Sequence, residues 1–503
     1  MSHPPAATDA DPGLPTVIYN GAGVIAAEPV VQQAPTATIT LPATNRRRLV
    51  ESLVLFVSAI LFLRAVTVEP FGVPTGSMAP TLCGNHKALA CPRCGYPVRV
   101  GEPGTHRGDY PDAHCPNCGF DHLALDDAPD ISGDRLLVDK NVFRVRSPRR
   151  WEVAVFICPS DKSKPYVKRV AGRPGEKIQV RDGDVWIDGE LARKTLAQAR
   201  ECRVAVFDAD YAPPGGWRQR WLADGTRPVI GTAEPARPPD WLTLDGNDVV
   251  IAADGSTGPR LVAYWHVSPD SRTAEVIRDG FEYNGHTSPT HDYAVHDFLI
   301  ECEAEVQAGA GNLILKLTDG ADEATAVIGA GGEFGESKLV LPPKGLVKTA
   351  NRPPLKPGKS YRVEMAFVDR RVSVAVDGHE YFAFDLPPAE KRPDVTSPFR
   401  LGAEGATIAF RHIKLYRDIY YRPGDRHAGA EPHQLGPDEY FMLGDNSANS
   451  DDSRSWQIPG VPERNFLGKP FLLHQPSRPA QWGVAGRRVD AQAIDWDRIR
   501  WLR

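Results

Sequence analysis

Several features that would define whole classes of protein are scarce in this sequence. Aromatic residues make up only 8% of it, the formal net charge is -5, and a single long apolar run is present. A chain without a basic excess gives no reason to expect a nucleic-acid partner, and one apolar run excludes a multi-spanning membrane protein. The 41% of hydrophobic and 24% of charged residues are ordinary for globular domains, which excludes a wholly disordered or collagen-like chain.

Glycine and proline, by contrast, are abundant. The chain contains 45 Gly and 46 Pro in 503 residues, about 18% together against an average of about 12%. This composition favours turns and strands over long helices, so we expect mainly β structure. With about 150 residues per domain, the length predicts roughly three structural units.

The single apolar run extends from residue 49 to residue 68. Its 20 residues would span about 30 Å as a helix, and only Glu51 and Arg64 are charged, both near its ends. Three arginines (46–48) precede it, so the positive-inside rule predicts a single-pass transmembrane helix at 49–68 with residues 1–45 in the cytoplasm. A cleaved signal peptide and a buried core helix are the alternative interpretations.

The pattern of strand-like segments divides the rest of the chain. The segment 1–45 is rich in Ala, Pro and Thr and predicts a disordered cytoplasmic tail. Short alternating runs with β-branched residues occur on both sides of a long gap, and they predict one β-domain made of 69–200 and 431–503, the second part with a C-terminal tail. The gap itself contains strongly alternating segments of a sandwich type. We therefore expect residues 201–430 to be a β-sandwich inserted into the first domain.

Four of the eight cysteines are spaced as two C-x-x-C pairs. CPRCG contains Cys91 and Cys94, and CPNCG contains Cys115 and Cys118. Two such pairs can place four thiolates tetrahedrally about Zn²⁺, and the Gly after each second Cys lets the backbone turn toward the sulfurs. The spacing predicts a structural zinc ribbon inserted at 88–122, with two disulfides or inert thiols as alternatives. The other four cysteines show no such spacing and are expected to be buried.

Three further segments carry residues of catalytic type. Ser77 lies in a Gly-Ser turn, Lys168 lies in an otherwise apolar strand, and GDNSANSDDSR (444–454) is an acidic, serine-rich loop. Each alone has an ordinary interpretation: a serine in a turn, a lysine whose charged head reaches solvent, and a solvated loop. Their significance comes from their occurrence together, in this order, after the apolar run.

Together these segments resemble bacterial signal peptidase I, a membrane-bound serine protease with a Ser-Lys dyad. The resemblance rests on SMAPTL from Ser77, SGDRLLVDK from Ser132, YVKRVAGRPGE from Tyr166 and the GDN loop. It implies a mainly β, signal peptidase/LexA-like catalytic core on the exocytoplasmic side of the bacterial inner membrane. It also implies preprotein signal peptides with small-x-small sites as substrates, a lipid bilayer and the secretion machinery as partners, and no cofactor for catalysis.

The resemblance further implies residue roles. Ser77 is expected to be the nucleophile and Lys168 the general base, which requires the pKa of Lys168 to fall by about 2–3 pH units from its ordinary value near 10.4, a fall that burial can supply. Ser450 is expected to orient Lys168, and the Thr75 hydroxyl with the Ser77 N–H to bind the oxyanion. The remaining implied residues are Asp452 paired with Arg454, the supporting Asp445 and Arg169, and Met78 for substrate binding.

Two positions depart from the family pattern. Glu176 stands where the PGD of the lysine motif usually has Asp, and Ser447-Ala448 stands where Arg-Asp commonly follows GDN. Neither change touches the nucleophile or the base, so we expect them to alter only supporting contacts of the loop.

The segment 201–430 loosely resembles concanavalin-like carbohydrate-binding jelly rolls, so a glycan ligand, a protein ligand and a spacer role are all open. Trp217, Trp221, Trp241 and Trp265 would form a sugar platform unless they are core residues. Two other functions remain as alternatives. One is a non-catalytic envelope adhesion module with a relict dyad; the other is a self-cleaving Ser-Lys repressor of related fold, which the predicted anchor and the absence of a helix-turn-helix pattern disfavour.

Overall fold

The computed structural model describes residues 43–502, apart from 103–112, 218–219, 229–236, 254, 256–257, 268–272, 286–292, 333–335, 342–344 and 485–486. The chain divides into two compact units, Met1–Ile60 and Leu61–Arg503. The predicted tail lies outside the described residues except for its last three, which begin a helix. As the composition predicted, strands dominate the described part of the chain.

Helix α1 (Ala43–Val66) contains most of the apolar run. The apolar side chains along it are exposed, among them Leu53 at 56%, Leu55 at 69% and Phe56 at 65%. Among the residues that the structure describes, no helix combines the length and apolar character needed to cross a bilayer. The transmembrane helix at 49–68 therefore stays a prediction.

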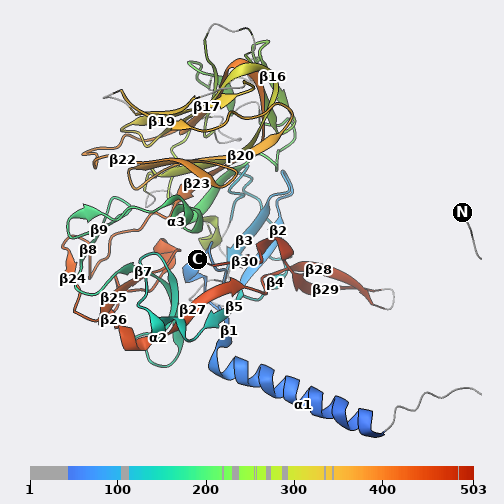
Figure 1. The fold of residues 1–503 in the computed structure, drawn as a ribbon, viewed down its shortest axis with the longest axis vertical. Helices are drawn as coiled ribbons and strands as arrows, with labels where there is room; N and C mark the ends of the chain where they lie inside the picture. The colour runs from blue at the N-terminus through green and yellow to red at the C-terminus, as the bar shows by residue number, and fades with distance from the viewer. Residues whose placement is uncertain are drawn as a thin grey trace, which may run out of the picture. The chain divides into compact units, whose positions relative to one another are not determined.

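Two antiparallel sheets lie near the candidate dyad, and the larger one carries Lys168 (Figure 1). The larger one consists of β1 (Val68–Gly72), β5 (Arg135–Asp139), β27 (Phe466–Leu473), β6 (Val153–Ile157), β7 (Pro165–Gly172), β25 (Glu439–Leu443) and β26 (Gly460–Pro462) in that spatial order, with β30 (Arg500–Trp501) beside β27. The smaller one has the order β10 (Glu190–Leu191), β9 (Asp184–Ile187), β8 (Lys177–Arg181) and β24 (His433–Gln434). Segments from both sides of the 201–430 stretch thus build the same two sheets.

The local sequence explains why these strands form. All of β6 reads VAVFI, a β-branched and apolar run that is buried apart from its last residue, as suits a central strand. The hairpin between β8 and β9 turns at Asp182 and Gly183, which have φ values of 54° and 88°. Two consecutive positive φ values define the tight turn that matches strand twist, and Asp-Gly is a preferred pair for it.

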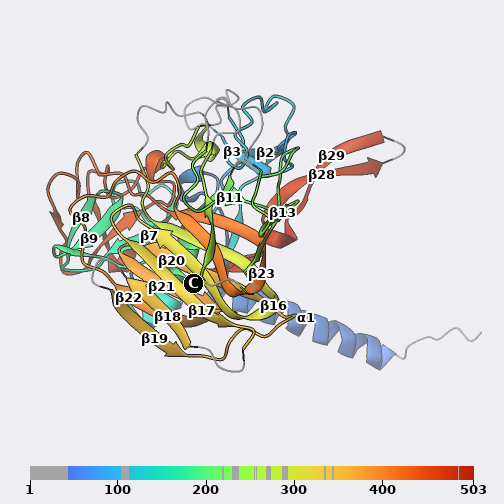
Figure 2. The ribbon, with the colours of Figure 1, turned by 90° about the horizontal axis from the view of Figure 1, so that it is seen from above.

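The 201–430 stretch supplies a 13-stranded antiparallel sheet. Its strands are β11 (Arg203–Asp208), β12 (Trp221–Ala223), β13 (Leu242–Asp245), β14 (Asp248–Ala252), β15 (Arg260–Tyr264), β16 (Phe298–Thr318), β17 (Glu323–Ala330), β18 (Glu336–Leu341), β19 (Leu346–Asn351), β20 (Ser360–Val368), β21 (Arg371–Val376), β22 (His379–Asp385) and β23 (Phe399–Asp418). Figure 1 shows β17 and β19 in one layer and β20 and β22 in another, and Figure 2 shows both from above.

Two long strands, β16 and β23, pass from one layer into the other. The first part of β16, up to Glu305, pairs with β20, and its last part, from Gly311, pairs with β17. Between these parts its register against β23 shifts twice, at Val306/Ala308 and at Gly309/Asn312. Such irregularities bend a strand and let one sheet fold over on itself. The two layers enclose one apolar core, in which Phe298, Leu315 and Phe410 are fully buried or nearly so.

The tryptophan residues of this stretch belong mainly to that core. Trp217 and Trp221 are only 4% and 3% exposed, and both pack against Phe207. Trp241 and Trp265 are half-buried. A ring that is covered by its own core offers no face to a sugar, so Trp217 and Trp221 are core residues and the alternative of a sugar platform does not hold for them.

The four-cysteine segment lies against a small sheet of β3 (Pro97–Gly101), β2 (His86–Ala90) and β4 (Asp130–Ile131). It packs on the 13-stranded sheet, because Asn117, inside the second C-x-x-C pair, donates to the carbonyls of Asp208 at 3.0 Å and Tyr211 at 3.1 Å. In return the Asp208 N–H donates to Asn117 Oδ1 at 2.9 Å. A separate two-stranded hairpin consists of β28 (Ser477–Val484) and β29 (Arg487–Ile494).

Helix α3 (Leu196–Glu201) and a buried ionic cluster join the 13-stranded sheet to the smaller sheets. Helix α2 (Val142–Val145) packs against β27 instead. Lys194, just before α3, contacts Asp369 at 3.1 Å and Asp418 at 2.8 Å, and all three side chains are almost fully buried. Burial alone would lower the pKa of Lys194, but these carboxylates hold its pKa well above the ordinary value. The ammonium therefore stays charged and ties the two parts together.

Candidate functional site

Ser77 lies in the 3-10 turn η1 (Gly76–Met78), shortly after strand β1. The Ala79 N–H donates to the Gly76 carbonyl at 3.0 Å and the Leu82 N–H donates to the Met78 carbonyl at 2.8 Å, so the turn is internally bonded. Met78 has no exposed surface and packs in an apolar cluster with Leu136 and Val155. Met78, expected to contact substrate, thus supports the turn from the core side in this structure.

Lys168 projects toward Ser77 from β7, which lies between β6 and β25. Its side chain is buried, and Lys168 Nζ donates to Ser77 Oγ at 2.6 Å and to Ser450 Oγ at 3.1 Å. Burial lowers the pKa of Lys168 from 10.5 to about 8, because the charged ammonium has lost its hydration. The carboxylates of Asp452 and Asp451 act in the opposite direction and keep it from falling further.

Ser450 reaches Lys168 because the loop around it is closely packed. Ser450 follows the 3-10 turn η4 (Ser447–Asn449). Gly444, six residues earlier, has no room for a Cβ atom, which would clash with Ser450 Oγ and with the Ser77 carbonyl oxygen. Glycine at this position therefore lets the loop approach the serine turn.

A buried ion pair stabilises the same loop. Arg454 contacts the Asp452 carboxylate through two nitrogens, Nε at 2.8 Å and Nη2 at 2.7 Å. The Gly444 N–H donates to Asp452 Oδ2 at 3.0 Å. Burial alone would raise the pKa of Asp452, but the Arg454 guanidinium and Lys168 hold that pKa below its ordinary value. The carboxylate stays ionised, and the pair that the sequence predicted is present.

A second buried pair lies next to the candidate dyad in the chain. Arg169 Nε donates to Asp445 Oδ1 at 2.7 Å, and Arg169 Nη1 donates to the Trp151 carbonyl at 2.7 Å. Because adjacent residues of a strand point to opposite faces, Arg169 binds Asp445 behind β7 while Lys168 faces Ser77. Asp445 and Arg169 thus contact each other and do not contact the serine or the lysine side chain.

Thr75 directly precedes η1. Its side chain is exposed, and its hydroxyl does not cap the turn. The position is compatible with a hydroxyl that meets a bound substrate.

The departures from the family pattern have local partners. Glu176 Oε1 accepts from Arg150 Nη2 at 2.7 Å, so the longer carboxylate still forms an ion pair. Ser447 Oγ accepts from Arg454 Nη1 and from the Arg422 N–H, both at 2.8 Å. Both changes therefore concern supporting contacts, as expected.

One residue of the loop that the sequence reasoning did not single out contacts the serine turn directly. The Asn446 N–H donates to the Ser77 carbonyl at 3.1 Å, and Asn446 Nδ2 donates to the Gly76 carbonyl at 3.0 Å. Asn446 belongs to the GDN motif itself, so its place in that motif was the available signal.

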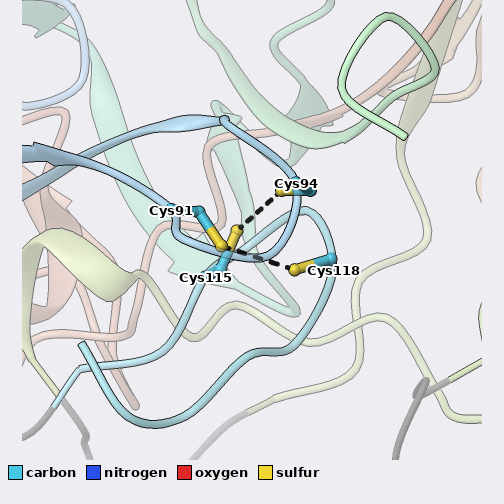
Figure 3. Close-up of side chains that lie close together, drawn as sticks. All are labelled: Cys91, Cys94, Cys115 and Cys118. Atoms are coloured by element: carbon cyan, nitrogen blue, oxygen red, sulfur yellow. Dashed lines mark hydrogen bonds between the residues drawn. The ribbon is translucent and has the colours of Figure 1, made fainter. Parts of the chain in front are cut away.

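The four spaced cysteines converge on one point (Figure 3). Their sulfur atoms all lie within 4.8 Å of one another, with 3.6 Å between Cys91 and Cys118 and 3.7 Å between Cys94 and Cys115. A disulfide would require about 2.0 Å, whereas four sulfurs at about 2.3 Å from a tetrahedral metal ion would be about 3.8 Å apart. The cluster can therefore hold a metal ion, and these four residues would be its ligands.

Two equivalent backbone turns shape this cluster. Gly95 and Gly119 have φ values of 79° and 72°, and their N–H groups donate to the carbonyls of Cys91 and Cys115, both at 2.8 Å. The turn therefore requires a residue that tolerates positive φ after each second cysteine. Four protein ligands leave a metal ion no open coordination position, so such an ion would have a structural role.

Comparison with known proteins connects this geometry to a family. Residues 128–219 and 401–474 match the family model described as signal peptidase, peptidase S26. These segments include β7 with Lys168 and the loop with Asp452. Over these two segments the chain is similar to the signal peptidase family.

Curated signal peptidases match the same family core. Signal peptidase I of Pseudomonas fluorescens is 31% identical over 147 residues, which are 29% of this chain and 38% of that protein. Signal peptidase I of Rickettsia massiliae is 28% identical over 144 residues, which are 29% of this chain and 44% of that protein. The chain thus spans less than half the length of these relatives.

Solved structures that resemble part of the chain are remote from it in sequence. A carbohydrate-binding module from Bacillus subtilis covers 39% of this chain at 14% identity and a TM-score of 0.22, with 94% of its own chain covered. An alginate lyase from Zobellia galactanivorans covers 41% of this chain at 9% identity and a TM-score of 0.25, with 97% of its own chain covered. Scores this low support no assignment of ligand or activity.

Proposed function

We propose that the chain is a signal peptidase I-type serine endopeptidase, which removes N-terminal signal peptides from preproteins after small-x-small sites. The observation that carries the proposal is the distance of 2.6 Å between Nζ of the buried Lys168 and Oγ of the partly exposed Ser77. A nucleophile and a base within hydrogen-bond reach, with the base oriented by a third group, Ser450, is the arrangement that activates a serine. No cofactor enters this chemistry.

The proposed reaction starts from the neutral Lys168 amine. As Ser77 Oγ attacks the scissile carbonyl, Lys168 takes the hydroxyl proton, and a C–O bond forms. The resulting ammonium then gives the proton to the leaving amine as the peptide C–N bond breaks. Water then attacks the acyl-enzyme while Lys168 accepts a water proton, and Lys168 gives that proton to Ser77 Oγ as the ester C–O bond breaks. A pKa of about 8 for Lys168 suits both proton transfers, because both the amine and the ammonium are then populated near neutral pH.

The oxyanion of each tetrahedral intermediate needs hydrogen-bond donors. We assign this role to the Ser77 N–H and the Thr75 hydroxyl, which flank Gly76 in the same turn. The substrate would bind as an extended strand next to β1, which ends the strand order of the larger sheet and leads into the serine turn. Small side chains at two alternate positions would then enter shallow pockets.

The proposal predicts that Ser77→Ala and Lys168→Met each reduce cleavage of a preprotein by about 10³-fold or more, since the residual rate lacks nucleophile or base. The measurement is the amount of mature product formed by purified protein on a preprotein with an A-x-A site. Ser163→Ala and Lys162→Met, both at exposed positions, are the matched controls and should cleave at the wild-type rate. Wild-type rates in Ser77→Ala would overturn the assignment.

The pKa of Lys168 predicts the pH dependence. Only the neutral amine accepts the serine proton, so kcat/KM should rise with pH with a midpoint near 8 and fall at lower pH. The Asp451 carboxylate stabilises the ammonium, so Asp451→Asn should move the midpoint to lower pH. Asp438→Asn, an exposed carboxylate paired with Arg464, is the control and should not move it. A profile that is flat between pH 6 and 10 would contradict a lysine base.

We further propose that the metal of the cysteine cluster is zinc. Purified protein should then contain about one zinc per chain by elemental analysis, and Cys118→Ser should reduce that content, because one of four ligands is lost. Cys158→Ser removes a buried cysteine outside the cluster and should leave the zinc content unchanged. Protein without metal whose four thiols are oxidised would show that the ribbon is closed by disulfides instead.

We also propose that residues 49–68 anchor the catalytic part to the exocytoplasmic face of a bacterial inner membrane. The exposed side chains of Leu55 and Phe56 support this, since apolar side chains along a helix are stable in a bilayer. The wild-type chain should stay with membranes after alkaline carbonate extraction, whereas replacing both residues by Arg should release it. Val145→Arg changes an exposed apolar position outside the run, and this variant should stay with the membranes. Release of the wild-type chain would refute the anchor.

A further inference from the structure

A short element of the 201–430 stretch contacts the turn that carries Ser77. This element is the 3-10 turn η2 (Glu282–Asn284). The ring of Tyr283 is 4% exposed and lies against the backbone of Gly76, so that a Cβ atom at Gly76 would clash with it. The same ring leaves no room for a Cβ atom at Gly101, in strand β3 of the ribbon. Tyr283 therefore fills the space between the serine turn and the ribbon.

The next residue, Asn284, contacts the loop of the candidate site. Asn284 Nδ2 donates to Asn446 Oδ1 at 2.7 Å, and Asn446 Nδ2 donates to Asn284 Oδ1 at 2.6 Å. Each amide thus satisfies the other in a reciprocal pair. Asn446 in turn binds the carbonyls of Gly76 at 3.0 Å and Ser77 at 3.1 Å. A continuous chain of hydrogen bonds leads from the 201–430 stretch to the backbone of the serine.

The turn η2 is itself held in place from two sides. Glu282 pairs with His114 of the ribbon at 3.0 Å. On the other side, Arg417 Nη2 in β23 donates to the carbonyls of Asp279 at 3.0 Å and Gly280 at 3.1 Å. Phe281 stacks on the Tyr283 ring with the planes 15° apart. A contact held in this way can fix the position of what it touches, because its own freedom is already restricted.

We infer that Tyr283 and Asn284 are positioning residues of the peptidase site, supplied by the inserted β-sandwich. This inference rests on the proposed function. Asn284 holds Asn446, and Asn446 holds the carbonyl of the Gly76–Ser77 peptide bond and the next carbonyl, that of Ser77. Tyr283 packs against Gly76, on the same peptide unit. The position of Ser77 Oγ relative to Lys168 and the direction of the Ser77 N–H both follow from that peptide bond. A catalytic serine must be held to within about 0.5 Å for full activity.

The inference gives the 201–430 stretch a part in catalysis. If the sandwich were only a spacer or a ligand-binding appendage, its side chains would have no need to contact the serine turn. With this contact, the docking of the sandwich against the ribbon and the loop becomes a condition for the active geometry of the dyad.

The test is Asn284→Ala in the full-length chain, with preprotein cleavage measured at several substrate concentrations. We expect kcat to fall by about tenfold while KM changes by less than about twofold, since a misplaced serine slows the chemical step and leaves the substrate contacts intact. Asn446→Ala should lower kcat similarly, and the double variant should be little worse than either alone, because both remove one chain of hydrogen bonds. Asn312→Ala, which removes the hydrogen bond to Glu404 inside the sandwich, is the matched control and should keep wild-type kcat.

A second measurement does not depend on activity. Hydrogen exchange of the peptide covering residues 74–82 should be faster in Asn284→Ala than in wild type, and unchanged in Asn312→Ala. If the wild-type chain cleaves a preprotein but Asn284→Ala has wild-type kcat and exchange, the inference is wrong and the proposed function stands. If the wild-type chain cleaves no preprotein, the proposed function is wrong, and the exchange result alone decides whether Asn284 holds the serine turn.

Discussion

The candidate site depends on the burial of one amine. Lys168 is 2% exposed and is hydrogen-bonded to two serine hydroxyls, and no ion pair of Lys168 occurs among the described residues. An ammonium in such a place has lost its water without gaining a contacting carboxylate, so the neutral form becomes accessible near neutral pH. A carboxylate in direct contact would stabilise the ammonium and remove the base.

The charged groups around Lys168 are arranged so that its neutral form stays accessible near neutral pH. Asp452, the carboxylate that raises the pKa of Lys168 most, accepts two hydrogen bonds from Arg454. Asp445 is paired with Arg169 on the opposite face of β7. Each of these two buried carboxylates is therefore paired with an arginine, and the side chain of Lys168 is hydrogen-bonded to serine hydroxyls. Removing either arginine would leave a buried carboxylate unpaired, which is strongly destabilising.

The sequence allowed the features that depend on neighbouring residues to be predicted, but few of the contacts between residues far apart in the chain. Alternation predicted the strand-like segments, and C-x-x-C spacing predicted the sulfur cluster, because both patterns act over a few residues. Asn284 and Asn446 are 162 residues apart, and no sequence pattern near Asn284 indicates that the two side chains are in contact. The choice between a sugar platform and a core role for the tryptophans stayed open for a related reason, since Trp221 packs on Phe399, which is far from it in the chain. The roles of Ser77 and Lys168 came from resemblance and remain proposals.

The central claim is that burial holds Lys168 as a base near neutral pH, and its pKa can be measured directly. The full-length protein labelled with ¹³C at lysine Cε can be titrated by NMR, with the Lys168 signal identified by its loss in Lys168→Met. The account predicts one lysine that titrates near pH 8 while the exposed lysines titrate at their ordinary values near 10.4. A Lys168 signal that titrates with the exposed lysines would contradict the account.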